Sequence, residues 1–136
     1  MREWIVPTIG TLVLWGLWSF MPRLITQYLE PKSAIIYQAL GSVVTTAVIL
    51  CLLRFRLETH PRGIVLALVT GIVGCLGSVT YLVAMSKSQV SAVVGITALY
   101  PALSVLLAVI VLKEPLTFRQ GADIVLALIA MVLIAV

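Results

Sequence analysis

Apolar residues form long runs along the chain, and short clusters of charged residues separate these runs. The uncharged stretches cover residues 4–22, 33–53, 63–86, 88–112 and 124–136. A helix that crosses a bilayer needs about 20 apolar residues. The first four stretches reach this length, and the fifth reaches it when its helix begins at Phe118, with Arg119 and Asp123 in an interfacial first turn. The pattern therefore predicts transmembrane helices at about 4–22, 33–53, 63–86, 88–112 and 118–136.

The composition supports this interpretation. Hydrophobic residues make up 62% of the 136 residues and charged residues 10%, whereas soluble domains carry about 45–50% and about 25%. So few charges cannot cover a water-soluble surface, which excludes soluble enzymes, secreted disulfide scaffolds and disordered tails. Continuous apolar runs favour helices over the alternating strands of a membrane barrel. We expect an all-α polytopic membrane protein, one domain over residues 1–136, with the lipid bilayer around it.

The connections between the predicted helices are short and contain Pro31, Pro61 and Pro115. Proline ends one helix or opens the next, so consecutive helices should be antiparallel neighbours. The first segment has a basic start like a signal peptide, but Pro7 interrupts it and no small-x-small cleavage site precedes Arg23. We expect this segment to remain as the first transmembrane helix.

Aromatic and polar side chains within the spans are the candidates for substrate binding. The first helix places Trp15 and Trp18 on one face at mid-membrane depth, where aromatic faces suit flat hydrophobic ligands and cations. Core packing or anchoring at the interface is the alternative for both tryptophans. An amide within a membrane seeks a partner, although Gln38 also lies near the membrane surface. The predicted substrate-binding residues are Trp15, Trp18, Gln38, Tyr81, Thr97 and Tyr100.

Two further features concern helix geometry. The third helix carries a stripe of small residues, which allow close packing of helices in lipid; its members are Gly71, Gly74, Gly77 and Ser78. This stripe predicts a packing seam, which is compatible with a cavity lining near Tyr81. In the fourth helix, Pro101 removes a backbone hydrogen bond near mid-helix. Pro101 is therefore a candidate hinge, with a static kink as the equal alternative.

The ionisable residues provide no catalytic pattern. No carboxylate, lysine or arginine lies in the middle of a predicted span, although proton-driven transporters commonly keep one there. Asp123 is the one candidate for coupling, and a structural role at a helix start is the stronger interpretation. Cys51 and Cys75 lie in apolar runs as small hydrophobic residues, and His60 lies in a loop. We expect no enzyme, no metal, no cofactor and no binding of nucleic acid.

The carboxyl-terminal half resembles the EamA domain of the drug/metabolite transporter superfamily. The resemblance is carried by Leu-Tyr-Pro-Ala-Leu-Ser at 99–104, Leu-Lys-Glu-Pro-Leu-Thr at 112–117, and the segments at 81–87, 91–95 and 120–121. Trp15-Gly16 followed by Phe20 is similar to the family's first helix. The resemblance extends over essentially the whole chain and implies a five-helix half-transporter.

Most members of that family resemble two EamA domains in tandem, ten helices with the second half inverted relative to the first. The short relatives that confer multidrug resistance have four helices and an acid in the first one, and this chain lacks that acid. Their proton-coupled antiport is therefore not implied here. The family's glutamate after the fourth helix corresponds to Glu114, where a role in the loop or at a helix start is expected.

These observations predict a transporter, with outward transport of a small organic solute by alternating access between two five-helix halves. A non-transporting accessory or regulatory subunit is the alternative from another class. The cytoplasmic side of a membrane protein carries the excess of Lys and Arg. The amino-terminal side has six such residues and the other side three, which predicts a multi-pass protein of the cell (inner) membrane with a cytoplasmic amino terminus. The expected partner is a second copy in a homodimer, antiparallel or not, or an inverted EamA-like protein.

Overall fold

The computed structural model describes residues 3–113, 115 and 117–135, and within these residues it is entirely helical. The helices are α1 (Ile5–Ile25), α2 (Pro31–Leu52), α3 (Pro61–Lys87), α4 (Val90–Thr97), α5 (Tyr100–Leu112) and α6 (Phe118–Ala135). Pro31 and Pro61 are the first residues of their helices, a position where the missing N–H has no helical acceptor. The all-α prediction is thus confirmed for the described chain.

Four helical segments are long and apolar enough to cross a membrane: Ile5–Ile25, Pro31–Leu52, Pro61–Lys87 and Val90–Leu112. α6 is an 18-residue helix that begins with Phe118 and Arg119. Its apolar part starts only after Asp123 and is the shortest of the predicted runs. A fifth transmembrane helix therefore stays a prediction.

The predicted helix at 88–112 is two helices in the structure, which corrects the sequence interpretation. Between α4 and α5, Leu99 N donates to Ile96 O at 3.3 Å and Ala102 N to Leu99 O at 3.0 Å. These bonds reach back three residues instead of four, so the backbone tightens here. Pro101 has no N–H to donate to the Thr97 carbonyl, and α5 begins with Tyr100 and Pro101. The proline therefore ends one helix and opens the next.

Pro101→Ala should merge α4 and α5 into one continuous helix. Alanine restores the N–H for the Thr97 carbonyl, and proline is about 3 kcal/mol less favourable than alanine inside a helix. Amide hydrogen exchange at residues 98–102 in micelles should slow in this variant. Pro31→Ala is the matched control, because Pro31 opens α2 and removes no helical bond. Unchanged exchange in Pro101→Ala would show that another residue sets the break.

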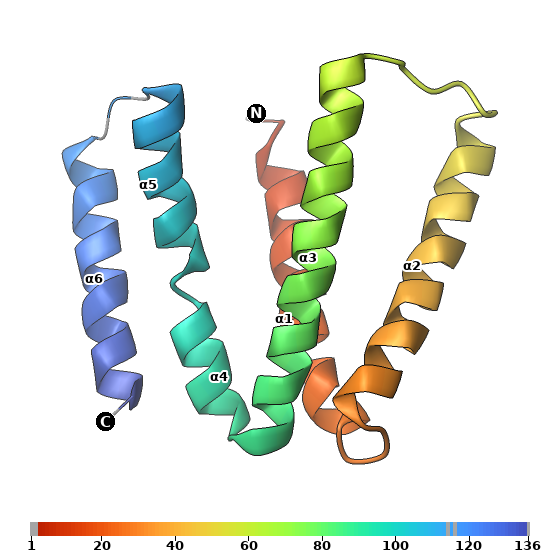
Figure 1. The fold of residues 1–136 in the computed structure, drawn as a ribbon. Coiled ribbons are helices and arrows are strands. Elements are labelled where there is room, and N and C mark those ends of the chain that lie inside the picture. Colours follow the sequence, from red (N-terminus) through yellow and green to blue (C-terminus); the bar gives the residue numbers. More distant parts are fainter. Residues whose placement is uncertain (1–2, 114, 116, 136) are drawn as a thin grey trace. The chain divides into compact units, whose positions relative to one another are not determined.

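The chain divides into two compact units, Met1–Lys87 and Ser88–Val136, and each is described by itself. In the first unit, α3 contacts both α1 and α2. α2 leans away from α3 towards the connection at residues 53–60 (Figure 1). In the second unit, α4 contacts α6. One domain over residues 1–136 stays a prediction.

Buried residues of the first unit gather at one of its ends. Met85 and Leu82, near the end of α3, are 0% and 1% exposed. Pro22 near the end of α1 and Ala34 near the start of α2 are also buried. Because α1 ends, α2 begins and α3 ends on the same side, these residues pack together there. We call this region the packed end of the first unit.

Most large apolar side chains elsewhere are exposed. Val6 near the start of α1 and Leu52 at the end of α2 are each 77% exposed. An apolar outer surface is what lipid tails require, because the bilayer core offers no partners for polar groups. The helices thus present to the bilayer the residues that a soluble protein would bury.

Candidate functional site

The predicted site residues fall in both units. Trp15 and Trp18 lie on α1, Gln38 on α2 and Tyr81 on α3, all in the first unit. Thr97 is the last residue of α4 and Tyr100 the first residue of α5, both in the second unit. The convergence of all six residues on one cavity therefore stays a prediction.

Trp18 and Tyr81 form a stacked aromatic pair between α1 and α3. Their ring centroids are 5.5 Å apart, and the ring planes differ by 20°. Offset-stacked rings in this range stabilise each other beyond the area they bury. Trp18 remains 42% exposed, so the stack covers only part of its side chain. The structure brings together these two predicted residues.

Two hydrogen bonds join α1 to α3 beside this pair. The Tyr81 hydroxyl donates to the Ser19 carbonyl oxygen at 2.9 Å. One turn further along both helices, the Arg23 Nη1 donates to the Met85 carbonyl oxygen at 3.0 Å. Residues four apart share a helix face, so two parallel helices repeat a contact at this interval. Sequence reasoning missed Arg23 and Met85 as contacts.

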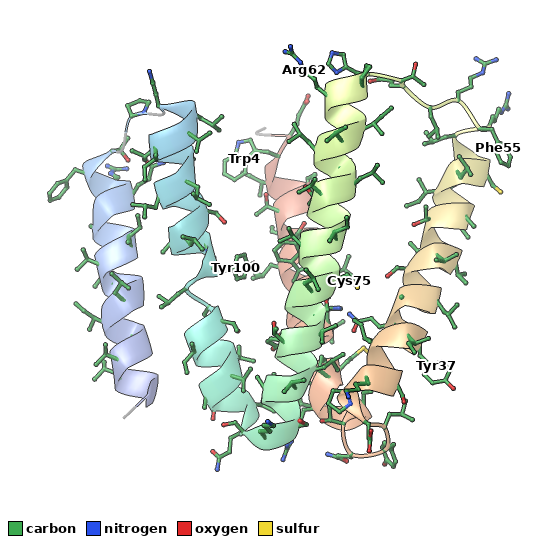
Figure 2. All side chains as sticks on the ribbon, viewed as in Figure 1. Trp4, Tyr37, Phe55, Arg62, Cys75 and Tyr100 are labelled. Carbon is green, nitrogen blue, oxygen red and sulfur yellow. The ribbon has the colours of Figure 1, made fainter. Side chains whose placement is uncertain are left out.

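The Gln38 carbonyl and the Thr97 hydroxyl form hydrogen bonds within their own helices. Gln38 is half-buried on α2, where its carbonyl accepts a bond from Ser42 Oγ at 3.2 Å. Thr97 Oγ1 donates to the Val93 carbonyl at 2.8 Å within its own turn. Tyr37, beside Gln38, projects away from α3 (Figure 2) and is exposed. Nothing in the described part of the chain links Gln38 to Trp18 or Tyr81.

Hydroxyl groups along the spans bond mostly to their own helix. Thr8 Oγ1 donates to Trp4 O at 2.7 Å, Thr70 Oγ1 to Leu66 O at 2.8 Å, and Ser78 Oγ to Gly74 O at 2.9 Å. Such bonds satisfy a hydroxyl proton in an apolar medium. The remaining lone pairs of these hydroxyls can only accept hydrogen bonds.

The glycine stripe of α3 faces open space. A Cβ atom added at Gly71, Gly74 or Gly77 would meet no atom within 4 Å. In the described chain, therefore, no neighbouring helix packs closely on these glycines. The packing seam predicted at Gly71, Gly74, Gly77 and Ser78 stays a prediction.

Charged groups and pockets add little to the site. The described residues contain no group of three or more His, Cys, Asp or Glu able to hold a metal ion. Glu114 and the side chain of Asp123 lie outside the described residues, so coupling through Asp123 stays a prediction. A shallow apolar depression at the start of α3 is lined by Pro61, Arg62, Val65 and Leu66, and contains no predicted site residue.

Comparison with known proteins identifies the family. The family model of EamA-like transporters matches residues 2–136. The chain is also similar to the uncharacterized protein MJ1333.1 of Methanocaldococcus jannaschii, with 25% identity over 124 residues, which cover 91% of this chain and 90% of that protein. No solved structure matches the chain. The match over residues 2–136 shows that this chain belongs to the EamA-like transporter family, as a single EamA-like domain of the drug/metabolite transporter superfamily.

Proposed function

We propose that this chain transports a small organic solute by alternating access, exports it, and works as a dimer of five-helix halves. Family membership supports a membrane transporter and a non-enzymatic role. The observation that carries the substrate class is the Trp18–Tyr81 stack between two membrane-spanning helices. In repeat transporters the substrate lies near mid-membrane between the two halves.

The proposed binding surface is aromatic and weakly polar. Trp15 and Trp18 are both exposed on α1, and aromatic faces bind apolar rings and organic cations. Gln38, Tyr81, Thr97 and Tyr100 complete the proposed surface. Because no fixed charge lies in the middle of the predicted spans, the surface suits amphipathic or neutral solutes better than small inorganic ions.

A ligand screen tests this assignment. Thermal shift of the purified chain in detergent, against amino acids, sugars, nucleotide precursors and drugs, should find amphipathic aromatic compounds among the stabilising ligands. Ligands that bind the folded state raise its apparent stability by mass action. Stabilisation by inorganic ions alone would contradict the substrate class.

The accessory subunit is the second candidate function. It is favoured by the absence of an acidic residue in the middle of the predicted spans, since ion-driven transporters commonly keep one there. A gene for another short EamA-like protein beside this one would favour a paired transporter instead. Solute flux by this chain without any other protein would eliminate the accessory role.

Pairing requires a second half that is inverted relative to the first. We propose an antiparallel homodimer, in which one gene supplies both orientations. Lys and Arg number six on the amino-terminal side and three on the other side, a bias that places the amino terminus in the cytoplasm in most single-orientation proteins. An inverted EamA-like partner from another gene is the alternative.

Cysteine labelling from each side of the membrane distinguishes these assemblies. In a background with Cys51 and Cys75 replaced by alanine, Glu3→Cys and Gln89→Cys place one thiol each on opposite sides. A dual-topology homodimer predicts that an impermeant maleimide modifies each site from both sides. Labelling of each site from one side only would exclude the antiparallel homodimer and leave a heteromeric or parallel assembly.

A further inference from the structure

The contacts between α1 and α3 gather at the packed end of the first unit. The Trp18–Tyr81 stack and the bonds at Ser19 and Arg23 all lie in the last two turns of α1. Their partners lie within the last two turns of α3. Towards the other end of these helices the side chains are exposed, as at Val6 and Leu66. The first unit is therefore held together at one membrane side and loosely packed at the other.

The two hydrogen bonds form a ladder with a constant register. Ser19 and Tyr81 are 62 positions apart, and so are Arg23 and Met85. Four residues advance an α-helix by about one turn, roughly 5.4–6 Å, so the second rung lies one turn beyond the first on both helices. Each rung ends on a backbone carbonyl, which is available whatever side chain that residue carries.

α1 has a weak point between the two rungs. Pro22 lies inside α1, between Ser19 and Arg23, and cannot donate to the Trp18 carbonyl. Helices bend sharply at such prolines because the backbone bond is missing. The last turn of α1, with Arg23, is thus able to move while the part with Ser19 stays in place.

Arg23 suits this position through its charge and its length. Its guanidinium binds a carbonyl in the last turn of α3, where the helix dipole favours a cation. Near a membrane surface, a long basic side chain keeps its head group at the interface while its stem lies along apolar surface. When the bond breaks, the guanidinium meets headgroups or water and not lipid tails. The free-energy cost of separating the two helices therefore stays low.

We infer that Arg23 and Tyr81 form a gate at the packed end, which closes this side of the solute pathway and opens by separation of α1 from α3. Arg23 is a positioning residue, because it acts on α1 and α3 and not on the solute. The gate rests on the proposed transport function. In a copy with a cytoplasmic amino terminus, the packed end, with Arg23, Lys32 and Lys87, faces outward, and the gate is the external one.

Distances between spin labels test the gate. In a background lacking Cys51 and Cys75, the pair Leu24→Cys/Ser86→Cys reports on the packed end and Thr8→Cys/Thr70→Cys on the other end. Both pairs keep the 62-residue offset. Pulsed electron paramagnetic resonance in liposomes, with labelled chains diluted by unlabelled chains, gives the distance distribution at each end. This reading does not depend on which way a chain is inserted.

Arg23→Ala should raise the ratio of separated to closed molecules at the packed end about tenfold, since a hydrogen bond from a charged group is lost. Tyr81→Phe keeps the stacked ring and should raise the same ratio about threefold. Lys32→Ala removes a charge from the same side and contacts neither rung, so its distribution should match the wild type.

Unchanged distances in Arg23→Ala and Tyr81→Phe would overturn the gate, and so would an equal effect of Lys32→Ala. Solute flux in the same liposomes separates this outcome from failure of the proposed function. If the chain transports solute and the spin-label distances of the variants are unchanged, the gate is rejected and the proposed transport function is retained. If the distances change but no solute flux is measured, the α1–α3 contact does hold the two helices together, and transport by this chain is rejected.

Discussion

Gly74→Ile should leave the fold of the single chain intact and weaken the pairing of two chains about tenfold or more, the effect of overpacking a close contact. The added side chain meets open space in the chain itself, since no atom lies within 4 Å of a Cβ at Gly74. It would enter the surface on which a second helix is predicted to pack. Energy transfer between donor- and acceptor-labelled chains in liposomes measures the pairing.

Gly10→Ile is the matched control, because Gly10 on α1 also faces open space and lies outside the glycine stripe. It should leave pairing unchanged. Circular dichroism should show the same helix content for both variants. Normal pairing of Gly74→Ile would contradict a seam on α3.

Trp18→Ala should raise the solute concentration for half-maximal flux about tenfold. The substitution removes the ring that stacks on Tyr81 and that we propose to stack on an aromatic ligand. The Tyr81 hydroxyl would still donate to the Ser19 carbonyl, and Arg23 to the Met85 carbonyl, so α1 and α3 keep both of these hydrogen bonds. Flux against solute concentration in proteoliposomes measures the shift. Trp15→Ala should act in the same direction if Trp15 lines the same surface.

Trp18→Phe and Trp4→Ala serve as controls. Phenylalanine retains an aromatic face and should restore most of the affinity. Trp4 lies just before α1, at the opposite end of this helix from Trp18, so its removal takes away an equally large ring far from the Trp18–Tyr81 pair. If Trp15→Ala and Trp18→Ala both transport like the wild type, these tryptophans do not line the pathway.

The helices were predictable because their signal is repeated along many residues. An uncharged stretch of membrane length is recognisable without knowledge of its neighbours, and α1, α2 and α3 begin and end within a few residues of the predicted bounds. The division of residues 88–112 was not foreseen. Pro101 indicated a missing backbone hydrogen bond, but the shift to bonds over three residues at Leu99 and Ala102 depends on local backbone geometry that apolar periodicity does not encode.

The site was predictable only in part. Trp18 and Tyr81 stood out as large aromatic residues on faces of small or polar ones, and the structure pairs them. The Arg23–Met85 contact could not be predicted from the sequence. Arg23 is one of several charged residues that mark a helix end, and Met85 contributes a backbone carbonyl, which every residue possesses. Ser19 and Tyr81 have the same sequence separation as Arg23 and Met85. This equality predicts a contact only when α1 and α3 are known to be parallel neighbours.

The most direct test of transport by this chain is solute flux in proteoliposomes that contain no other protein. A solute selected by thermal shift is loaded on one side, and its exchange across the membrane is followed with time and concentration. The proposed function predicts saturable flux that Trp18→Ala weakens and Trp4→Ala leaves unchanged. Tight binding of that solute without saturable flux would contradict it.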